Sequence, residues 1–125
     1  MENELSDREV LIMKCVWEKE GSVTIQNVQH DVKEKFDWDA KPSTIRTFIT
    51  SIVAKRYLKI NKEGRTSYLI PLVSKEEYRD NQTKKMIDFW YGGSKGKLIK
   101  TLTEDEIGDA EVSHLMEVLD EISDN

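Results

Sequence analysis

The chain has 125 residues, of which 38% are hydrophobic and 34% are charged, and its formal net charge is −5. This length predicts one compact domain, or one small domain with an appended element. The apolar runs are too short to span a bilayer, and the opening Met-Glu-Asn-Glu lacks the basic and apolar regions of a secretion signal. The single cysteine, Cys15, excludes an intramolecular disulfide, so we expect a cytoplasmic protein without membrane insertion.

The first part of the chain predicts three helices. Residues 6–9, Ser-Asp-Arg-Glu, form a capping box, after which apolar residues at helical spacing continue a helix to about residue 19. Thr24 can cap a second helix, whose apolar face runs to Phe36. Pro42 suits the first turn of a third helix, which has an apolar stripe and ends near Arg56.

The hydrophobic period then changes to that of β-strands. Residues 57–61 and 67–70 alternate as half-buried strands do, and the turn between them contains Gly64. Three helices followed by a β-hairpin are the order of a winged helix-turn-helix.

The rest of the chain returns to helical patterns. A second capping box at residues 74–77 begins a long helix that ends at residues 92–93, a short helix covers about 94–102, and a last helix covers about 109–122. The sequence therefore predicts a mainly α fold with a small β-hairpin (α+β). Residues 1–73 form the winged helix-turn-helix, and residues 74–125 form a helical module.

The charges are unevenly distributed along this chain. No Asp or Glu lies between Asp39 and Glu63, whereas Lys and Arg recur through that stretch, and from residue 101 to 125 the pattern reverses. A basic middle and an acidic end indicate either a polyanion partner for the basic part or two differently charged solvated surfaces.

The third helix carries small and hydroxyl side chains, and no acid, opposite its apolar stripe. A solvated helix surface usually carries Glu and Lys, because Ser and Thr are weaker helix formers. Insertion into a DNA major groove explains this composition, since small side chains allow close approach and hydroxyls contact bases or phosphates. Arg46 can read a guanine with two hydrogen bonds or clamp a phosphate.

Basic residues flank that helix and recur on the hairpin. Such residues can lie over the DNA backbone, where they orient a protein without specifying sequence and make binding salt-dependent. The alternative for each single residue is an ordinary solvated charge, so the prediction depends on the group. The predicted DNA-binding residues are Lys41, Ser43, Thr44, Arg46, Thr47, Thr50, Lys55, Lys62 and Arg65.

The C-terminal helices carry more apolar surface than a solvated tail could hide. The alternative is that this segment packs back on its own N-terminal module. We favour dimerisation, since a twofold dimer presents two recognition helices to an inverted repeat of double-stranded DNA. The predicted dimerisation residues are Trp90, Leu98, Ile99, Leu102, Val112, Leu115, Met116, Leu119 and Ile122.

Two other classes of function compete with this interpretation. An enzyme needs a nucleophile, a base or a metal cluster, but Cys15, His30 and His114 lie on three different predicted helices. We therefore expect no catalysis, no cofactor and no metal. A winged helix that binds protein instead of DNA should display large apolar or acidic groups on its third helix, and this chain does not.

Several motifs occur together in a specific order. They are Ser-Asp-Arg-Glu at 6–9, Met-Lys-Cys-Val-Trp at 13–17, Thr-Ile-Arg-Thr at 44–47, Ala-Lys-Arg-Tyr-Leu at 54–58, Lys-Glu-Gly-Arg at 62–65 with Tyr68 and Pro71, and Phe-Trp-Tyr-Gly-Gly at 89–93. In these motifs the chain resembles, over nearly its whole length, the penicillinase and methicillin-resistance repressors (BlaI/MecI) and their copper-responsive CopY relatives.

The resemblance implies a dimeric transcriptional repressor that binds inverted-repeat operators with TACA/TGTA-like cores. It would control a β-lactam-resistance or related stress or transport operon. In the β-lactam branch, a membrane sensor-protease system triggers cutting of the repressor in the short C-terminal helix. The cleaved Asn-Phe pair of the family aligns with Lys100 and Thr101, which match neither residue. The paired Cys-x-Cys motifs of the copper branch do not occur here, which excludes metal sensing by that mechanism.

Overall fold

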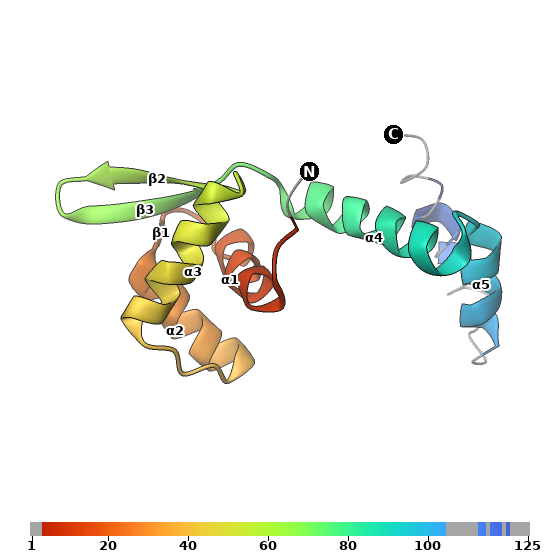
Figure 1. Cartoon of the computed structure of the whole chain (residues 1–125), viewed down its shortest axis with the longest axis horizontal. Coiled ribbons are helices and arrows are strands. Elements are labelled where there is room, and N and C mark those ends of the chain that lie inside the picture. Colours follow the sequence, from red (N-terminus) through yellow and green to blue (C-terminus); the bar gives the residue numbers. More distant parts are fainter. Residues whose placement is uncertain (1–3, 105–112, 115, 119, 121–125) are drawn as a thin grey trace. The chain divides into compact units, whose positions relative to one another are not determined.

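The computed structural model describes residues 4–104, 113–114, 116–118 and 120. The chain divides into two compact units, Met1–Lys75 and Glu76–Asn125. The elements, which Figure 1 shows in chain order, are α1 (Asp7–Glu18), β1 (Val23–Thr24), α2 (Ile25–Phe36), α3 (Pro42–Ala54), β2 (Leu58–Glu63), β3 (Thr66–Pro71), α4 (Lys75–Tyr91) and α5 (Lys95–Thr103). The prediction of a mainly α fold with a small β-hairpin is confirmed.

In the first unit, side-chain hydrogen bonds cap the N-termini of α1 and α2. At α1 the Ser6 N–H donates to Glu9 Oε1 at 2.7 Å, and the Glu9 N–H donates to Ser6 Oγ at 3.3 Å, so the predicted capping box is formed. Thr24 and Asn27 make the same reciprocal pair at the start of α2. In contrast, α3 begins without a side-chain cap and has Pro42 in its first turn, where the missing N–H costs nothing.

The sheet has three antiparallel strands in the order β1-β3-β2. The predicted hairpin forms its larger part, with Ile60 opposite Leu69 and Lys62 opposite Ser67. Strand β1 was not predicted, because two residues are too few to show an alternation. It pairs Val23 with Leu69 and Thr24 with Tyr68, and so ties the start of α2 to the hairpin.

The hairpin projects beyond the helices of its unit (Figure 1). Glu63 pairs with Thr66, which leaves a two-residue turn of Gly64 and Arg65. The φ angle of Gly64 is 61°, a left-handed conformation that a side chain disfavours. Along β2 only Leu58 is buried and the following residues are exposed, so the outer part of this strand extends beyond the core. This is the shape of a wing.

The hydrophobic core of the first unit lies where α1, α2 and α3 pack on one another against the base of the sheet. Its fully buried residues include Ile12 from α1, Val28 from α2 and Ile45 from α3. The one charged side chain recorded as buried among the described residues is Glu9, which is 2% exposed. The other buried apolar residues of the unit are Leu5, Met13, Cys15, Val16, Val23, Val32, Ala40, Ile49, Ile52, Tyr57, Leu58 and Leu69.

The second unit has a small apolar cluster of its own. Ile87 of α4 and Leu98 of α5 are buried, and the half-buried Tyr91, Ile99 and Leu102 pack against them. Gly92 and Gly93 end α4 with positive φ angles, and Ser94 caps α5 by accepting from the Lys97 N–H. None of the helices in the described part of the chain is both long and apolar enough to cross a membrane.

Candidate DNA-binding surface

The exposed side of α3 carries the residue types that the sequence predicted for DNA contact. Ile45, Ile49 and Ile52 bury one side of this helix in the core. The opposite side is therefore turned to solvent, and only Thr44 of the predicted contacts on it is half-buried. The other predicted contacts, at the start of α3 and along it, are exposed: Lys41, Ser43, Arg46, Thr47 and Thr50.

Two threonine hydroxyls on this surface bond to the helix itself. Thr47 Oγ1 donates to the Ser43 carbonyl at 3.0 Å, and Thr50 Oγ1 donates to the Arg46 carbonyl at 2.9 Å. Each hydroxyl thereby uses its one donor, and in this rotamer it offers only acceptor lone pairs to a partner. The surface can therefore accept from base amino groups, which cytosine and adenine present in the major groove.

Lys55 lies at the end of α3 and is bound within the unit. Its Nζ donates to Glu9 Oε1 at 2.6 Å and to the Glu4 carbonyl at 3.0 Å, and the side chain is 26% exposed. The ammonium charge is thus paired with a buried carboxylate and holds the end of α3 against α1. An ammonium held in this way is not free to turn toward a DNA phosphate.

Glu9 is strongly perturbed by this arrangement. Burial raises the pKa of its carboxyl, but hydrogen bonds from Lys55, the Ser6 backbone, and the Ser51 and Ser6 side chains outweigh burial and lower the pKa to about 2. The carboxylate is therefore ionised at neutral pH. Ser51 of α3 is half-buried, and its side chain interacts with Glu9.

The hairpin brings two further predicted residues to the surface. Lys62 on β2 and Arg65 in the turn are both exposed, and the outermost residue pair of the ladder, Glu63 with Thr66, lies between them. Ile60 on β2 is 45% exposed, although alternation along this strand predicted a half-buried position. Its cross-strand partner Leu69 on the central strand β3 is buried, whereas β2 is an edge strand of the sheet, which leaves Ile60 open to solvent.

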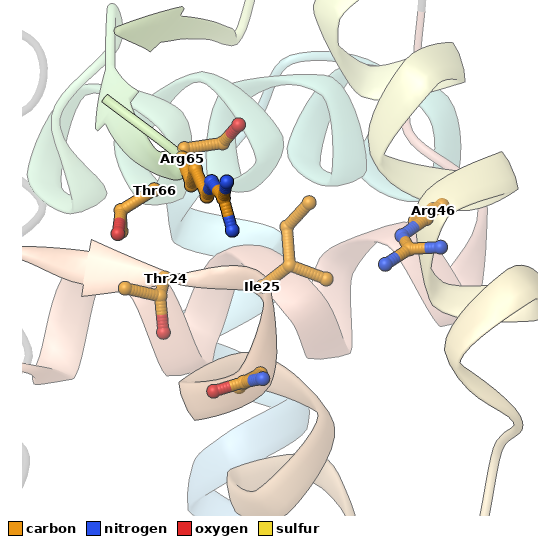
Figure 2. A pocket seen from close by; sticks show the side chains of 7 residues that line it. Thr24, Ile25, Arg46, Arg65 and Thr66 are labelled. Carbon is orange, nitrogen blue, oxygen red and sulfur yellow. The ribbon is translucent and has the colours of Figure 1, made fainter. Parts of the chain in front are cut away.

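A pocket of about 240 Å³ joins α3 to the wing. Figure 2 shows Arg46 approaching from α3 and Arg65 from the hairpin, with Ile25 between them. The residues that line it are Thr24, Ile25, Gln26, Arg46, Arg65, Thr66 and Ser67. The sequence pointed to the two arginines but not to the other five, because these meet only through the pairing of β1 with β3.

The predicted dimerisation residues divide into inward and outward groups. Leu98 is buried within its own unit, and Ile99 and Leu102 pack half-buried against it. Trp90 is 72% exposed, and Met116 is 49% exposed. Phe89, which is not among the predicted dimerisation residues, is 77% exposed. Its ring packs edge to face on that of Trp90, with the ring centroids 4.8 Å apart. Its place beside Trp90 in an aromatic run was the available signal. Four predicted residues lie outside the described part of the chain: Val112, Leu115, Leu119 and Ile122.

The predicted cleavage pair lies on α5. Lys100 and Thr101 are both exposed, and Thr101 Oγ1 donates to the Lys97 carbonyl at 3.1 Å. A protease needs an extended substrate, so cutting here requires local opening of this helix. Inactivation at this bond stays a prediction.

Other groups that carry chemistry are dispersed. Cys15 is buried, and burial raises the pKa of its thiol to about 11, so the thiol is protonated and lies in the core. On the surface, the hydrogen bond and charge between Glu18 and Lys35 lower the pKa of the carboxyl and raise that of the ammonium. Across the described residues, no group of three or more His, Cys, Asp or Glu side chains gathers to hold a metal ion.

Comparison with known proteins identifies the family. The family model for the penicillinase repressor matches residues 5–121. The methicillin resistance regulatory proteins MecI of Mammaliicoccus sciuri and of Staphylococcus aureus (strain N315) are each 26% identical over 117 residues, which cover 93% of this chain and 93% of each relative. A 16.5 kDa protein from the ptsI 3' region of Latilactobacillus sakei is 31% identical over 102 residues, which are 82% of this chain and 68% of that protein.

A solved structure supports the winged-helix fold. The solution structure of the DNA-binding domain of the repressor BlaI has a TM-score of 0.51 and 28% sequence identity, and the match covers 60% of this chain and 88% of that domain. The predicted winged helix and the predicted family are therefore both confirmed. The chain belongs to the penicillinase repressor family, a family of transcriptional repressors.

Proposed function

We propose that this repressor binds an inverted-repeat operator as a homodimer and controls an antibiotic-resistance, stress or transport operon. One observation carries the proposal: the exposed side of α3 is free of acids, bears hydroxyls and Arg46, and lies beside a wing with exposed Lys62 and Arg65. The names of the relatives agree with it, because the MecI proteins are methicillin resistance regulators and the BlaI domain is DNA-binding.

In this proposal α3 is the recognition helix. Its exposed hydroxyls approach base edges in the major groove, and the basic residues contact the phosphate backbone. The protein acts in the cytoplasm on double-stranded DNA. The proposed DNA contacts are Lys41, Ser43, Thr44, Arg46, Thr47, Thr50, Lys62 and Arg65.

We assign DNA binding to residues 1–73 and dimerisation to residues 74–125. The exposed aromatic pair of Phe89 and Trp90 supports dimerisation, because large apolar side chains exposed together mark an interaction surface. A twofold dimer of such chains matches an inverted repeat. If release from DNA follows the route of the β-lactam branch, a membrane sensor-protease system cuts between Lys100 and Thr101, and its specificity differs from that of a protease that cuts an Asn-Phe pair.

Fluorescence anisotropy of the full chain over a salt series tests the proposal. One duplex carries an inverted TACA/TGTA repeat from upstream of the protein's own gene, and the other carries a scrambled copy. We expect tight, salt-sensitive binding to the first duplex only. Equal weak binding to both duplexes would contradict sequence-specific recognition of this operator.

A further inference from the structure

The pocket between α3 and the wing has the charge of an anion site. Arg46 and Arg65 come from different elements, and their side chains approach Ile25 from opposite sides (Figure 2). None of the residues that line the pocket is acidic. Among the described residues, neither arginine has an ion-pair partner. Two like charges that face one pocket repel each other, so an anion between them lowers the energy of both.

The neutral lining of the pocket suits an oxyanion. Ser67 and Thr66, whose side chains carry hydroxyl groups, are among the residues that line the pocket. The N–H groups of Ile25 and Gln26 lie in the first turn of α2 and have no partner within that helix. A phosphodiester has two non-bridging oxygens that share one negative charge, and guanidinium groups hold such oxygens with strong hydrogen bonds.

The position of the pocket selects DNA as the source of the phosphate. If α3 enters a major groove and the wing touches the same duplex, the sugar-phosphate strand that borders the groove must pass between them. The pocket lies between these two elements. We infer that it holds one phosphodiester of the DNA backbone, clamped between Arg46 and Arg65. This inference rests on the DNA-binding function proposed above, and it assigns Arg46 to a phosphate and not to a guanine.

A double-mutant cycle tests the clamp. Arg46→Ala, Arg65→Ala and the double variant are compared with wild type on the operator duplex by anisotropy. We expect each single variant to bind on the order of 10-fold more weakly, and the double variant to lose much less than the product of the two losses. Both side chains are exposed, so the variants are expected to fold. Losses that multiply would overturn the clamp.

The salt dependence gives an independent count of phosphates. If the two arginines share one phosphate, the slope of log K against log salt falls by about 0.9 per protomer in the double variant. Two separate phosphates predict a fall of about 1.8. Lys59→Ala is the matched control, because Lys59 is exposed on β2 and does not line the pocket, so its effect should multiply with that of either arginine variant.

Two further measurements identify the anion. A single neutral methylphosphonate is moved through one half-site. Among the positions at which it weakens wild type, one should leave the double variant unaffected. The absence of such a position would overturn the clamp. Calorimetric titration with inorganic phosphate should give no binding, and binding that the double variant loses would assign the pocket to a free anion. The coupling between the arginines is also measurable on the scrambled duplex at low salt, so failure of the clamp is distinguishable from failure of operator recognition.

Discussion

Glu9 connects α1 to α3, the proposed recognition helix. It closes the capping box of α1 with Ser6, and it accepts the ammonium of Lys55 from the end of α3 at 2.6 Å. It does so while only 2% exposed, and its pKa is lowered to about 2. Breaking a buried ion pair from one side leaves an uncompensated charge, which costs more than the pair contributes. The placement of α3 therefore depends on an ionised carboxylate on a different helix.

We predict that this pair makes folding stability dependent on acid pH. The pKa of Glu9 is lower in the folded protein than its ordinary value of 4.5, so its contribution is complete above that pH and is lost as the pH falls toward 2. The difference corresponds to on the order of 3 kcal/mol. Urea unfolding should show Glu9→Gln less stable than wild type by about this amount at pH 7, with a smaller gap at pH 3.

Glu18→Gln is the matched control for this experiment. Glu18 pairs with Lys35 at 3.1 Å, but both side chains are well exposed, so water screens the pair and its loss should change stability little. A gap between Glu9→Gln and wild type that is equal at pH 7 and pH 3 would contradict the assignment.

The role of Glu9 was only partly predictable. The spacing of Ser6 and Glu9 predicted the capping box, because that hydrogen bond joins residues three apart. The pairing with Lys55 joins residues 46 apart, and no local pattern encodes it. In the sequence Lys55 is one more basic residue beside the third helix, so it was grouped with the predicted DNA contacts.

At the scale of elements, α4 and α5 turn part of their apolar surface inward and part outward. Leu98 and Ile87 form a buried pair between the two helices, whereas Trp90 and Phe89 are largely exposed. Periodicity identified apolar residues on these helices but not their partners. A stripe that packs on its own chain and one that packs on a second copy have the same spacing in the sequence.

We predict that Leu98→Ala and Trp90→Ala have different effects. Leu98→Ala leaves a cavity between α4 and α5 and should lower the free energy of unfolding by roughly 2 kcal/mol. Trp90→Ala should leave that stability nearly unchanged once dimerisation is accounted for, but raise the dimer dissociation constant by at least about 10-fold. Sedimentation equilibrium and unfolding at several protein concentrations separate the two effects.

Leu72→Ala controls for the loss of any exposed apolar side chain. Leu72 is 51% exposed but lies in the first unit, so its removal should not change the dissociation constant. The proposed interface would be wrong if Trp90→Ala dimerised as tightly as wild type.

At the scale of the whole molecule, the local charge matters more than the sum. The net charge is −5, yet the proposed DNA-binding surface on α3 and the wing carries exposed Lys41, Arg46, Lys62 and Arg65. Phosphate contacts depend on the charges that face the duplex and not on the net charge of the chain. An acidic isoelectric point therefore does not argue against DNA binding here.

We predict that the two units divide the work of operator binding. A fragment of residues 1–75 should bind a single half-site, and its salt slope per protomer should match that of the full chain. It should bind the inverted repeat about 10²–10⁴-fold more weakly than the full chain, because it lacks the linkage that makes the second contact intramolecular. Anisotropy with half-site and full-site duplexes measures both quantities. Equal affinity of fragment and full chain for the inverted repeat would contradict this division.

The sequence by itself determined the helices, their caps and the hairpin, because these depend on hydrogen bonds and packing between residues a few positions apart. Capping at Ser6, the first turn at Pro42 and the turn at Gly64 all follow from such local rules. Only the tertiary structure decided what the long-range contacts do. It created β1 by pairing with β3, bound Lys55 to Glu9, and brought Arg46 and Arg65 to one pocket. Each of these depends on how distant elements pack, and that packing leaves no periodic trace in the sequence.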